Sequence, residues 1–116
     1  MSSVINRGIS KAEFDNIFET GIRISGQYCR ILVASGQARV GISTPKKVGC
    51  HARRNRLKRR LRDAVKINVN LLSNELDTVV LGKIEAESAS FSEISADIGQ
   101  TLAKANELWE KQSAST

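Results

Sequence analysis

Residues 46–66 read KKVGCHARRNRLKRRLRDAVK, and the rest of the 116-residue chain is interpreted around this stretch. It contains ten of the eighteen Lys and Arg residues and one acid, Asp63, which gives it a net charge of +9. The whole chain carries +6, so the residues outside the stretch carry −3. Because the positive charge is concentrated in one place, the sequence predicts a binding surface for a polyanion.

From Ala52 onward this stretch has no Gly or Pro and is rich in residues that favour helices. Its apolar residues recur at steps of three and four, which places six of them along one side of a helix: Leu57, Leu61, Ala64, Val65, Val69 and Leu72. Arg54 and Lys58 project toward this side in the first turns. Five basic residues fall on the opposite arc: Arg53, Arg56, Arg59, Arg60 and Lys66. We therefore expect a helix that docks by one face and displays arginine on the other.

A basic amphipathic helix can also be a solvated surface helix, a membrane-surface helix or a calmodulin-target segment. A solvated helix normally interleaves acids that pair with basic residues four positions away, whereas Asp63 is the one acid here. A membrane helix needs bulky anchors on an exposed apolar face, whereas this apolar stripe suits an intramolecular core. The charge pattern therefore favours nucleic acid.

The block Arg54-Asn55-Arg56, followed by Lys58, Arg59 and Arg62, resembles the bacterial ribonuclease P protein component. That family carries an R-G-hydrophobic-S block, a K-K-hydrophobic-G turn and a helix of the form RNRhKRhhR. The corresponding segments here read RVGIS (residues 39–43), KKVG (46–49) and RNRLKRRLR (54–62), and the resemblance extends from about residue 11 to residue 105. It implies a single small α+β domain, an αβββαβα α/β sandwich with a mixed sheet. It also implies a left-handed βαβ crossover, although general rules favour a right-handed one.

The resemblance implies a protein subunit of ribonuclease P, an endoribonuclease whose RNA subunit removes the 5′ leader of precursor tRNA with Mg²⁺. The implied partners are the ribonuclease P RNA and the precursor tRNA 5′ leader, with no membrane and no protein partner required. Mg²⁺ would be bound mainly through the RNA subunit. The RNA-binding residues implied are Lys46, Lys47, Arg53, Arg54, Asn55, Arg56, Lys58, Arg59 and Arg62. The leader cleft implied contains the aromatic residues Phe14, Phe18 and Tyr28, although this chain has Ile31 or Leu32 where the family often has a further ring.

The whole chain, residues 1–116, is expected to form one domain with flexible ends at about 1–9 and 112–116. A hydrophobic content of 41% and a charged content of 26% are typical of globular proteins. The sequence has no apolar run of bilayer length and no signal-peptide pattern, so we expect a cytoplasmic protein. Cys29 and Cys50 are too few for a disulfide framework, and Cys50 with His51 falls short of a zinc site.

Local patterns predict the remaining elements. Ser10 and Glu13 form a capping box for a helix that ends at a left-handed Gly21. Phe14, Ile17 and Phe18 share one face of that helix. Residues 22–44 have β character, and we expect residues 27–34 and 38–44 to pair as a hairpin across residues 35–37. Further elements are a strand at 77–82 and a packing helix after a second capping box at residues 90–93, with the helices on one face of the sheet.

No catalytic triad, phosphate-binding loop or cluster of acids at metal-binding spacing is visible in the sequence, so the protein is expected to contribute no catalytic residues. The main alternative is a ribosomal or general RNA-binding protein without a role in cleavage. A DNA-binding module is a weaker alternative because no second helix precedes the basic one at helix-turn-helix distance. The last alternative is an adaptor for an acidic protein.

Overall fold

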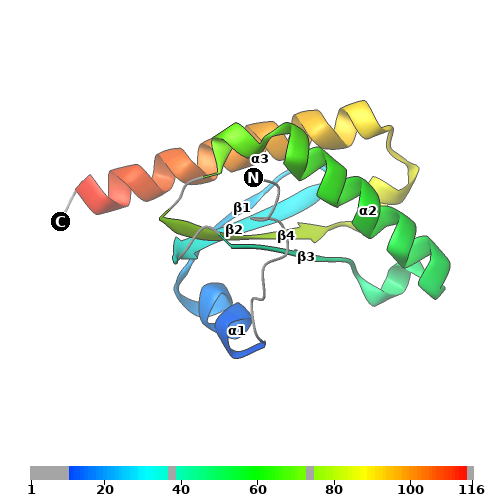
Figure 1. Cartoon of the computed structure of the whole chain (residues 1–116), viewed down its shortest axis with the longest axis horizontal. Coiled ribbons are helices and arrows are strands. Elements are labelled where there is room, and N and C mark those ends of the chain that lie inside the picture. Colours follow the sequence, from blue (N-terminus) through cyan, green and yellow to red (C-terminus); the bar gives the residue numbers. More distant parts are fainter. Residues whose placement is uncertain (1–10, 37–38, 73–74, 115–116) are drawn as a thin grey trace.

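The computed structural model describes residues 11–36, 39–72 and 75–114, which form three helices and a four-stranded sheet (Figure 1). The main elements are α1 (Lys11–Thr20), β1 (Ile22–Ser25), β2 (Cys29–Ser35), β3 (Val40–Ser43), α2 (His51–Ile67), β4 (Leu76–Gly82) and α3 (Phe91–Ala114). Short 3₁₀ helices lie between them: η2 (Lys46–Val48), η3 (Val69–Leu71) and η4 (Ile84–Ser88). This order confirms the predicted αβββαβα sandwich.

The strands are arranged in the order β1-β2-β4-β3. β1 pairs antiparallel with β2, and β2 with β4, whereas β3 and β4 run parallel, so the sheet is mixed as predicted. α2 connects the two parallel strands. Viewed from α2 with these strands pointing up, β4 lies to the left of β3, so the crossover is left-handed (Figure 1).

The predicted hairpin between residues 27–34 and 38–44 is wrong, because β4 lies between β2 and β3. Residues 76–80 of β4 are all buried, and a strand covered on both faces is stable when both of its edges are paired. Arg39, at the entry to β3, fixes this pairing through two nitrogens of its guanidinium group, which bond the buried carboxylate of Asp77 at 3.3 and 2.7 Å. Residues 37–38 of the predicted turn lie outside the described residues.

The tight hairpin of the sheet instead joins β1 to β2 across residues 26–28. The carboxylate of Asp97 in α3 accepts hydrogen bonds from the backbone N–H groups of Gln27 and Tyr28, both at 2.9 Å. On the other side, Lys83 Nζ donates to the carbonyl oxygen of Gly26 at 2.6 Å. Groups distant in sequence therefore hold this turn in place.

Helices cover both faces of the sheet, which corrects the prediction that they lie on one face (Figure 1). Alternating β2 residues point in opposite directions. Cys29, Ile31 and Val33 join the larger core under α2 and α3, whereas Leu32 and Ala34 join a smaller core under α1. The unbroken apolar sequence of β2 reflects this burial on both sides.

The second capping box is confirmed: Ser90 Oγ accepts from the N–H of Glu93 at 3.1 Å, and Glu93 accepts from the N–H of Ser90 at 2.9 Å. Gly21 ends α1 as predicted, but not in a left-handed conformation. A Cβ at Gly21 would lie 2.6 Å from carbonyl oxygens of Ile17 and Val33, so the close approach of α1 to β2 requires glycine. The first capping box includes residue 10, which lies outside the described residues.

The C-terminal helix extends into the segment expected to be a flexible end. α3 continues to Ala114, so residues 112–114 are helical, while residues 1–10 and 115–116 lie outside the described part. None of the helices in the described part is long and apolar enough to cross a membrane.

Candidate RNA-binding surfaces

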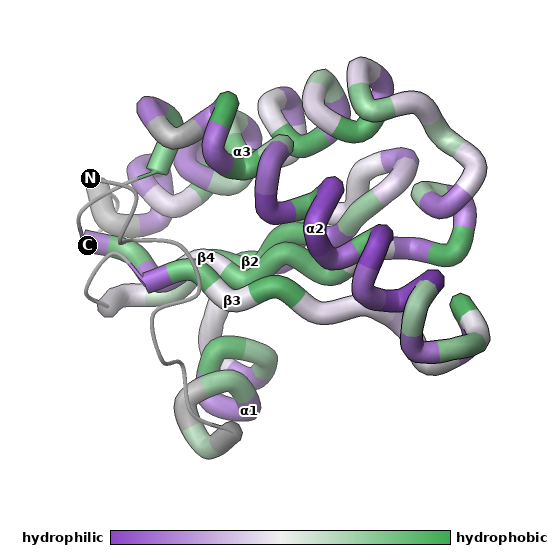
Figure 2. Tube along the Cα trace, turned by 45° about the vertical axis from the view of Figure 1, so that its right-hand side comes forward, coloured by the Kyte–Doolittle hydropathy of each residue, from purple (hydrophilic) through white to green (hydrophobic). Residues whose placement is uncertain are grey.

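α2 docks on the sheet by the face that its sequence predicts. Leu57, Leu61, Ala64 and Val65 are buried, Leu72 packs against the same core, and residue 69 lies beyond α2 in η3. Figure 2 shows hydrophilic residues along much of α2, in contrast to the largely apolar strands below it. The apolar stripe therefore fixes which side chains this helix presents outward.

The side chains on the outward surface of α2 are mostly basic. Of the basic residues, Arg53, Arg56, Arg59 and Lys66 are exposed, and Arg54, Lys58, Arg60 and Arg62 are half-buried. Asn55 is exposed among them, and so are His51, Ala52, Asp63 and Ile67. Lys46 and Lys47 lie in η2, just before the helix, and Lys47 is exposed. The structure thus gathers the predicted basic residues on one helix and the turn that leads to it. We call the Lys, Arg and Asn side chains within residues 46–47 and 53–62 the basic surface.

Two arginines of α2 are committed to internal partners. Arg53 forms an ion pair with Glu87 of η4 through Nε and through Nη2, the latter at 2.7 Å, and this contact raises the pKa of Arg53. Arg60 Nη2 donates to the carbonyl oxygen of Ala89 at 2.7 Å. The other α2 arginines form no ion pair with an acid of the described part, and Asp63 forms none within the helix. Most of the positive charge is therefore left for an external anion.

The first turns of α2 concentrate this uncompensated charge. The N-cap residue, Cys50, makes no side-chain capping bond, and the first turn contains no acid. Gly49 precedes it with a φ of 113°, a conformation that favours glycine. Arg54 and Arg56 then follow at the positive end of the helix dipole, where cations are unfavourable and anions are stabilised. Such an end suits phosphate groups.

A second surface lies on the opposite face of the sheet, where α1 covers part of β2 and β4. The rings of Phe14 and Phe18 lie 5.1 Å apart between centroids and are tilted by 40°. Both are half-buried against a small core of Ile17, Leu32, Ala34 and Val79. Each ring therefore packs partly into the core and leaves the rest of its surface exposed at the edge of α1.

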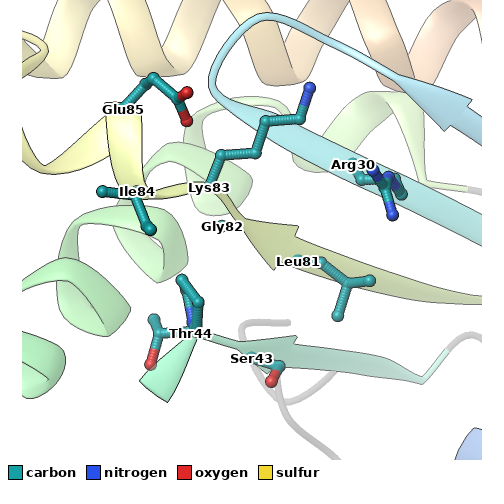
Figure 3. A pocket seen from close by; sticks show the side chains of 9 residues that line it. Arg30, Ser43, Thr44, Leu81, Gly82, Lys83, Ile84 and Glu85 are labelled. Atoms are coloured by element: carbon teal, nitrogen blue, oxygen red, sulfur yellow. The ribbon is translucent and has the colours of Figure 1, made fainter. Parts of the chain in front are cut away.

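Beside α1, the same face of the sheet is open and contains a hollow of about 410 Å³. Ser43, Leu81 and Arg30 lie next to each other on β3, β4 and β2, and their side chains line it (Figure 3). The other lining residues are Thr44, Pro45, Gly82, Lys83, Ile84 and Glu85. The α1 edge and this hollow are continuous through Leu81, which also packs against the small core. We call the α1 edge and the hollow together the cleft.

Tyr28 does not join Phe14 and Phe18 in the cleft. It packs against the larger core on the other side of the sheet, and its hydroxyl group donates to Glu93 Oε2 at 3.1 Å. Partial desolvation and this hydrogen bond raise the pKa of Tyr28. Because Asp97 holds the backbone of the turn, Tyr28 lies against α3 and outside the predicted set.

Arg30 occupies the exposed position in the cleft that sequence reasoning missed. It is the one charged residue in the apolar β2 sequence CRILVAS, and its exposure between buried neighbours marks an open part of the sheet. A single charged residue within an apolar strand was the feature of the sequence from which this exposed position could have been predicted.

The cysteines and acids of the described part offer no metal centre. Cys29 is buried, and its burial near Asp97 raises the pKa of its thiol, whereas Cys50 is exposed. Within residues 11–36, 39–72 and 75–114, no three His, Cys, Asp or Glu side chains come together as metal ligands.

The fold and these surfaces define a small α/β sandwich that displays a basic helix on one side and an open cleft on the other. The family model described as Ribonuclease P matches residues 6–106. The chain therefore belongs to the ribonuclease P protein family, as the sequence resemblance indicated. This family supplies the protein component of an endoribonuclease that processes tRNA, which implies an RNA partner.

Individual relatives agree with this assignment. The ribonuclease P protein component of Desulfosudis oleivorans is 31% identical over 104 residues, covering 87% of this chain and 86% of the relative. That of Lachnoclostridium phytofermentans is 28% identical over 99 residues, covering 83% and 84%. A solved structure of a Staphylococcus aureus RNase P protein mutant with defective mRNA degradation activity has a TM-score of 0.75 at 22% identity, covering 90% of this chain and 89% of that one. The RNase P protein from Thermotoga maritima has a TM-score of 0.72 at 24% identity, covering 79% and 90%. The two structures share the fold of this chain.

Proposed function

We propose that this protein binds the catalytic RNA of ribonuclease P through the basic surface and the 5′ leader of precursor tRNA in the cleft. In this way it assists the Mg²⁺-dependent removal of the leader. The observation that carries the proposal is the state of α2, which is docked by its apolar face and leaves most of its arginines without acidic partners among the described residues.

The basic surface suits structured RNA for two reasons. The planar guanidinium group of arginine donates two parallel hydrogen bonds to phosphate oxygens. Each phosphate that is neutralised also releases counterions, which favours binding at low salt. The residues in this role are Arg54, Arg56, Lys58, Arg59 and Arg62, extended by Lys46 and Lys47. Arg53 contributes less because Glu87 holds it, and the exposed Asn55 is free to hydrogen-bond RNA.

The cleft suits a single-stranded leader. Phe14 and Phe18 lie side by side at the edge of α1, where bases can stack on the exposed parts of their rings. Stacking accepts any base, so leader binding through these rings tolerates different sequences.

We assign the chemistry to the RNA subunit, where bound Mg²⁺ would supply a Lewis acid for the attacking water and the leaving oxygen. The described residues of the protein contain no suitable cluster of metal ligands. The protein residues neutralise phosphate repulsion at the basic surface and hold the leader, which keeps the substrate next to the catalytic RNA.

Reconstitution tests the proposal. The protein is added to its cognate ribonuclease P RNA at low Mg²⁺, and we expect faster cleavage of precursor tRNA at the mature 5′ end. Arg54→Ala combined with Arg56→Ala is expected to reduce this gain and to lower the salt slope of RNA binding by about 0.7–0.9 for each lost phosphate contact. Lys111→Ala, at an exposed position near the end of α3, is the matched control. RNA binding without any gain in cleavage would instead support a general RNA-binding protein.

A further inference from the structure

Two arginines of the first hairpin, Arg23 in β1 and Arg30 in β2, have no role so far in binding the RNA subunit or in base stacking, although Arg30 lines the hollow. Both side chains are exposed. Neither forms an ion pair with any acid in the described part of the chain. Two exposed arginines on neighbouring strands create a positive potential that attracts anions.

Both arginines belong to the cleft face of the sheet. Arg23 is paired with Leu32, which lies in the small core under α1. Arg30 is paired with Ser25 on one side and with Leu81 on the other, and Leu81 also packs against that core. Arg23 and Arg30 are therefore diagonal neighbours on one face, about 7–8 Å apart between their backbone positions.

The chemistry of the cleft changes along β2. Leu32 has no exposed surface, so no base can stack on it. The next side chain on the same face is Arg30, which is exposed. Beyond the two rings of α1, this face of the sheet thus presents the guanidinium groups of Arg30 and Arg23, and no third ring from the described part lines the hollow.

The row Ser43, Leu81, Arg30 and Ser25 crosses all four strands at one level. Its length is about 14 Å, from three spacings between neighbouring strands. Ser43 and Leu81, on β3 and β4, line the hollow at one end of this row. Arg30, on β2, is the next residue of the row toward the first hairpin. The acid of the hollow, Glu85, lies on the Lys83 side, whereas Ser43 and Leu81 lie on the opposite side of the hollow (Figure 3). An extended polyanion can follow the row without meeting that carboxylate.

We propose that Arg30 and Arg23 bind phosphates of the leader, so that its backbone crosses the sheet from the hollow to the first hairpin. This inference rests on the proposed function, because it takes the leader as the occupant of the cleft. The electrostatic contacts of the two arginines then supply the leader affinity that a third stacking ring would otherwise supply. Leader binding by this chain is consequently sensitive to salt and tolerant of base identity.

The test measures the affinity of the reconstituted holoenzyme for precursor tRNA and for mature tRNA over a range of salt, under conditions that block cleavage. We expect the Arg23→Ala, Arg30→Ala double variant to bind precursor tRNA about tenfold more weakly, the loss for two exposed ionic contacts. The salt slope for precursor tRNA should fall by about 1.4, since each single-strand contact contributes about 0.7. Binding of mature tRNA should be unchanged. A variant with Arg23→Ala and Arg30→Lys keeps a positive charge at position 30. Its salt slope for precursor tRNA should therefore fall by only about 0.7, half of the fall in the double alanine variant.

Three results would overturn the inference, and they differ in what else they affect. If the wild-type holoenzyme binds both RNAs equally, the leader assignment fails and the proposed function fails with it. If the wild type prefers precursor tRNA and the double variant keeps the full preference, this inference alone fails. If the double variant weakens binding of both RNAs equally, or if Lys111→Ala has the same effect as the double variant, the arginines act through general charge. Thermal unfolding checks that each variant is folded.

Discussion

Replacing Glu87 with Gln is expected to change stability and RNA affinity in opposite directions. Glu87 accepts two bonds from Arg53, and the pair is partly open to solvent, with side-chain exposures of 27% for Glu87 and 55% for Arg53. An ion pair this open to solvent adds little to the free energy of unfolding, so the variant should be only slightly less stable. Arg60 still anchors the same segment through Ala89, so the fold should be retained.

The gain in RNA affinity follows from the freed charge. Arg53 adjoins Arg54 and is exposed, so its release offers one more phosphate contact beside the RNR block. One additional contact steepens the slope of log affinity against log salt by about 0.7–0.9. The assay is binding of the Glu87→Gln protein to ribonuclease P RNA across a salt series, with thermal unfolding measured in parallel.

The control for this prediction is Glu110→Gln, which makes the same change in net charge at an exposed position of α3. It should affect RNA binding little, because exposed charges separated by more than about 10 Å are screened at 0.1 M salt. Weaker RNA binding by Glu87→Gln, or an unchanged slope, would refute the reasoning. An equal gain in both variants would show that net charge, and not release of Arg53, is responsible.

Three further predictions concern the cleft and the fold. Phe18→Ala should weaken holoenzyme binding of precursor tRNA by about 1–3 kcal/mol while sparing mature tRNA, because one stacking ring is lost; equal losses in a folded variant would assign the ring to the core. Ser90→Ala should lower the free energy of unfolding in denaturant by about 1 kcal/mol, because the N-cap bond is removed. The hydrogen bonds from Ser90 lower the pKa of Glu93 in the folded protein. The stability that they give is therefore present above about pH 4.5 and is lost as pH falls through the pKa of Glu93 in the folded state. The Ser90→Ala variant should lose less stability in acid. Gly21→Ala should destabilise the protein by about 1–3 kcal/mol, because its Cβ meets two carbonyl oxygens, and an unchanged unfolding midpoint would contradict this.

The basic helix could be predicted from sequence because its evidence is local. The spacing of Leu57 and Leu61 sets the buried face, and the arginines around them follow from the helical period. The position of Tyr28 could not be predicted in this way. It depends on Asp97, which is 69 residues away in the chain and holds the turn. The cleft residues predicted from sequence alone therefore included Tyr28, whose side chain lies on the opposite face of the sheet.

The strand order was also beyond local patterns. Consecutive apolar runs in residues 22–44 indicated a hairpin, but β4 enters the sheet between them from a point more than thirty residues further along. The buried character of β2 on both faces was readable as an unbroken apolar run, and this was the sign that helices cover both sides. The sequence thus predicted the class of fold and the basic surface. Which strands lie next to each other in the sheet depended on contacts between distant residues.

The central position of β4 has a consequence for biosynthesis. β3 pairs with β4, which emerges from the ribosome only after the whole of α2. Until residues 76–82 are available, the sheet is split into two parts and α2 lacks much of the surface on which it packs. The arginine-rich segment is therefore made before its platform is complete, and such late closure slows folding. A nascent chain halted before residue 76 would present the charged helix without the sheet that orients it.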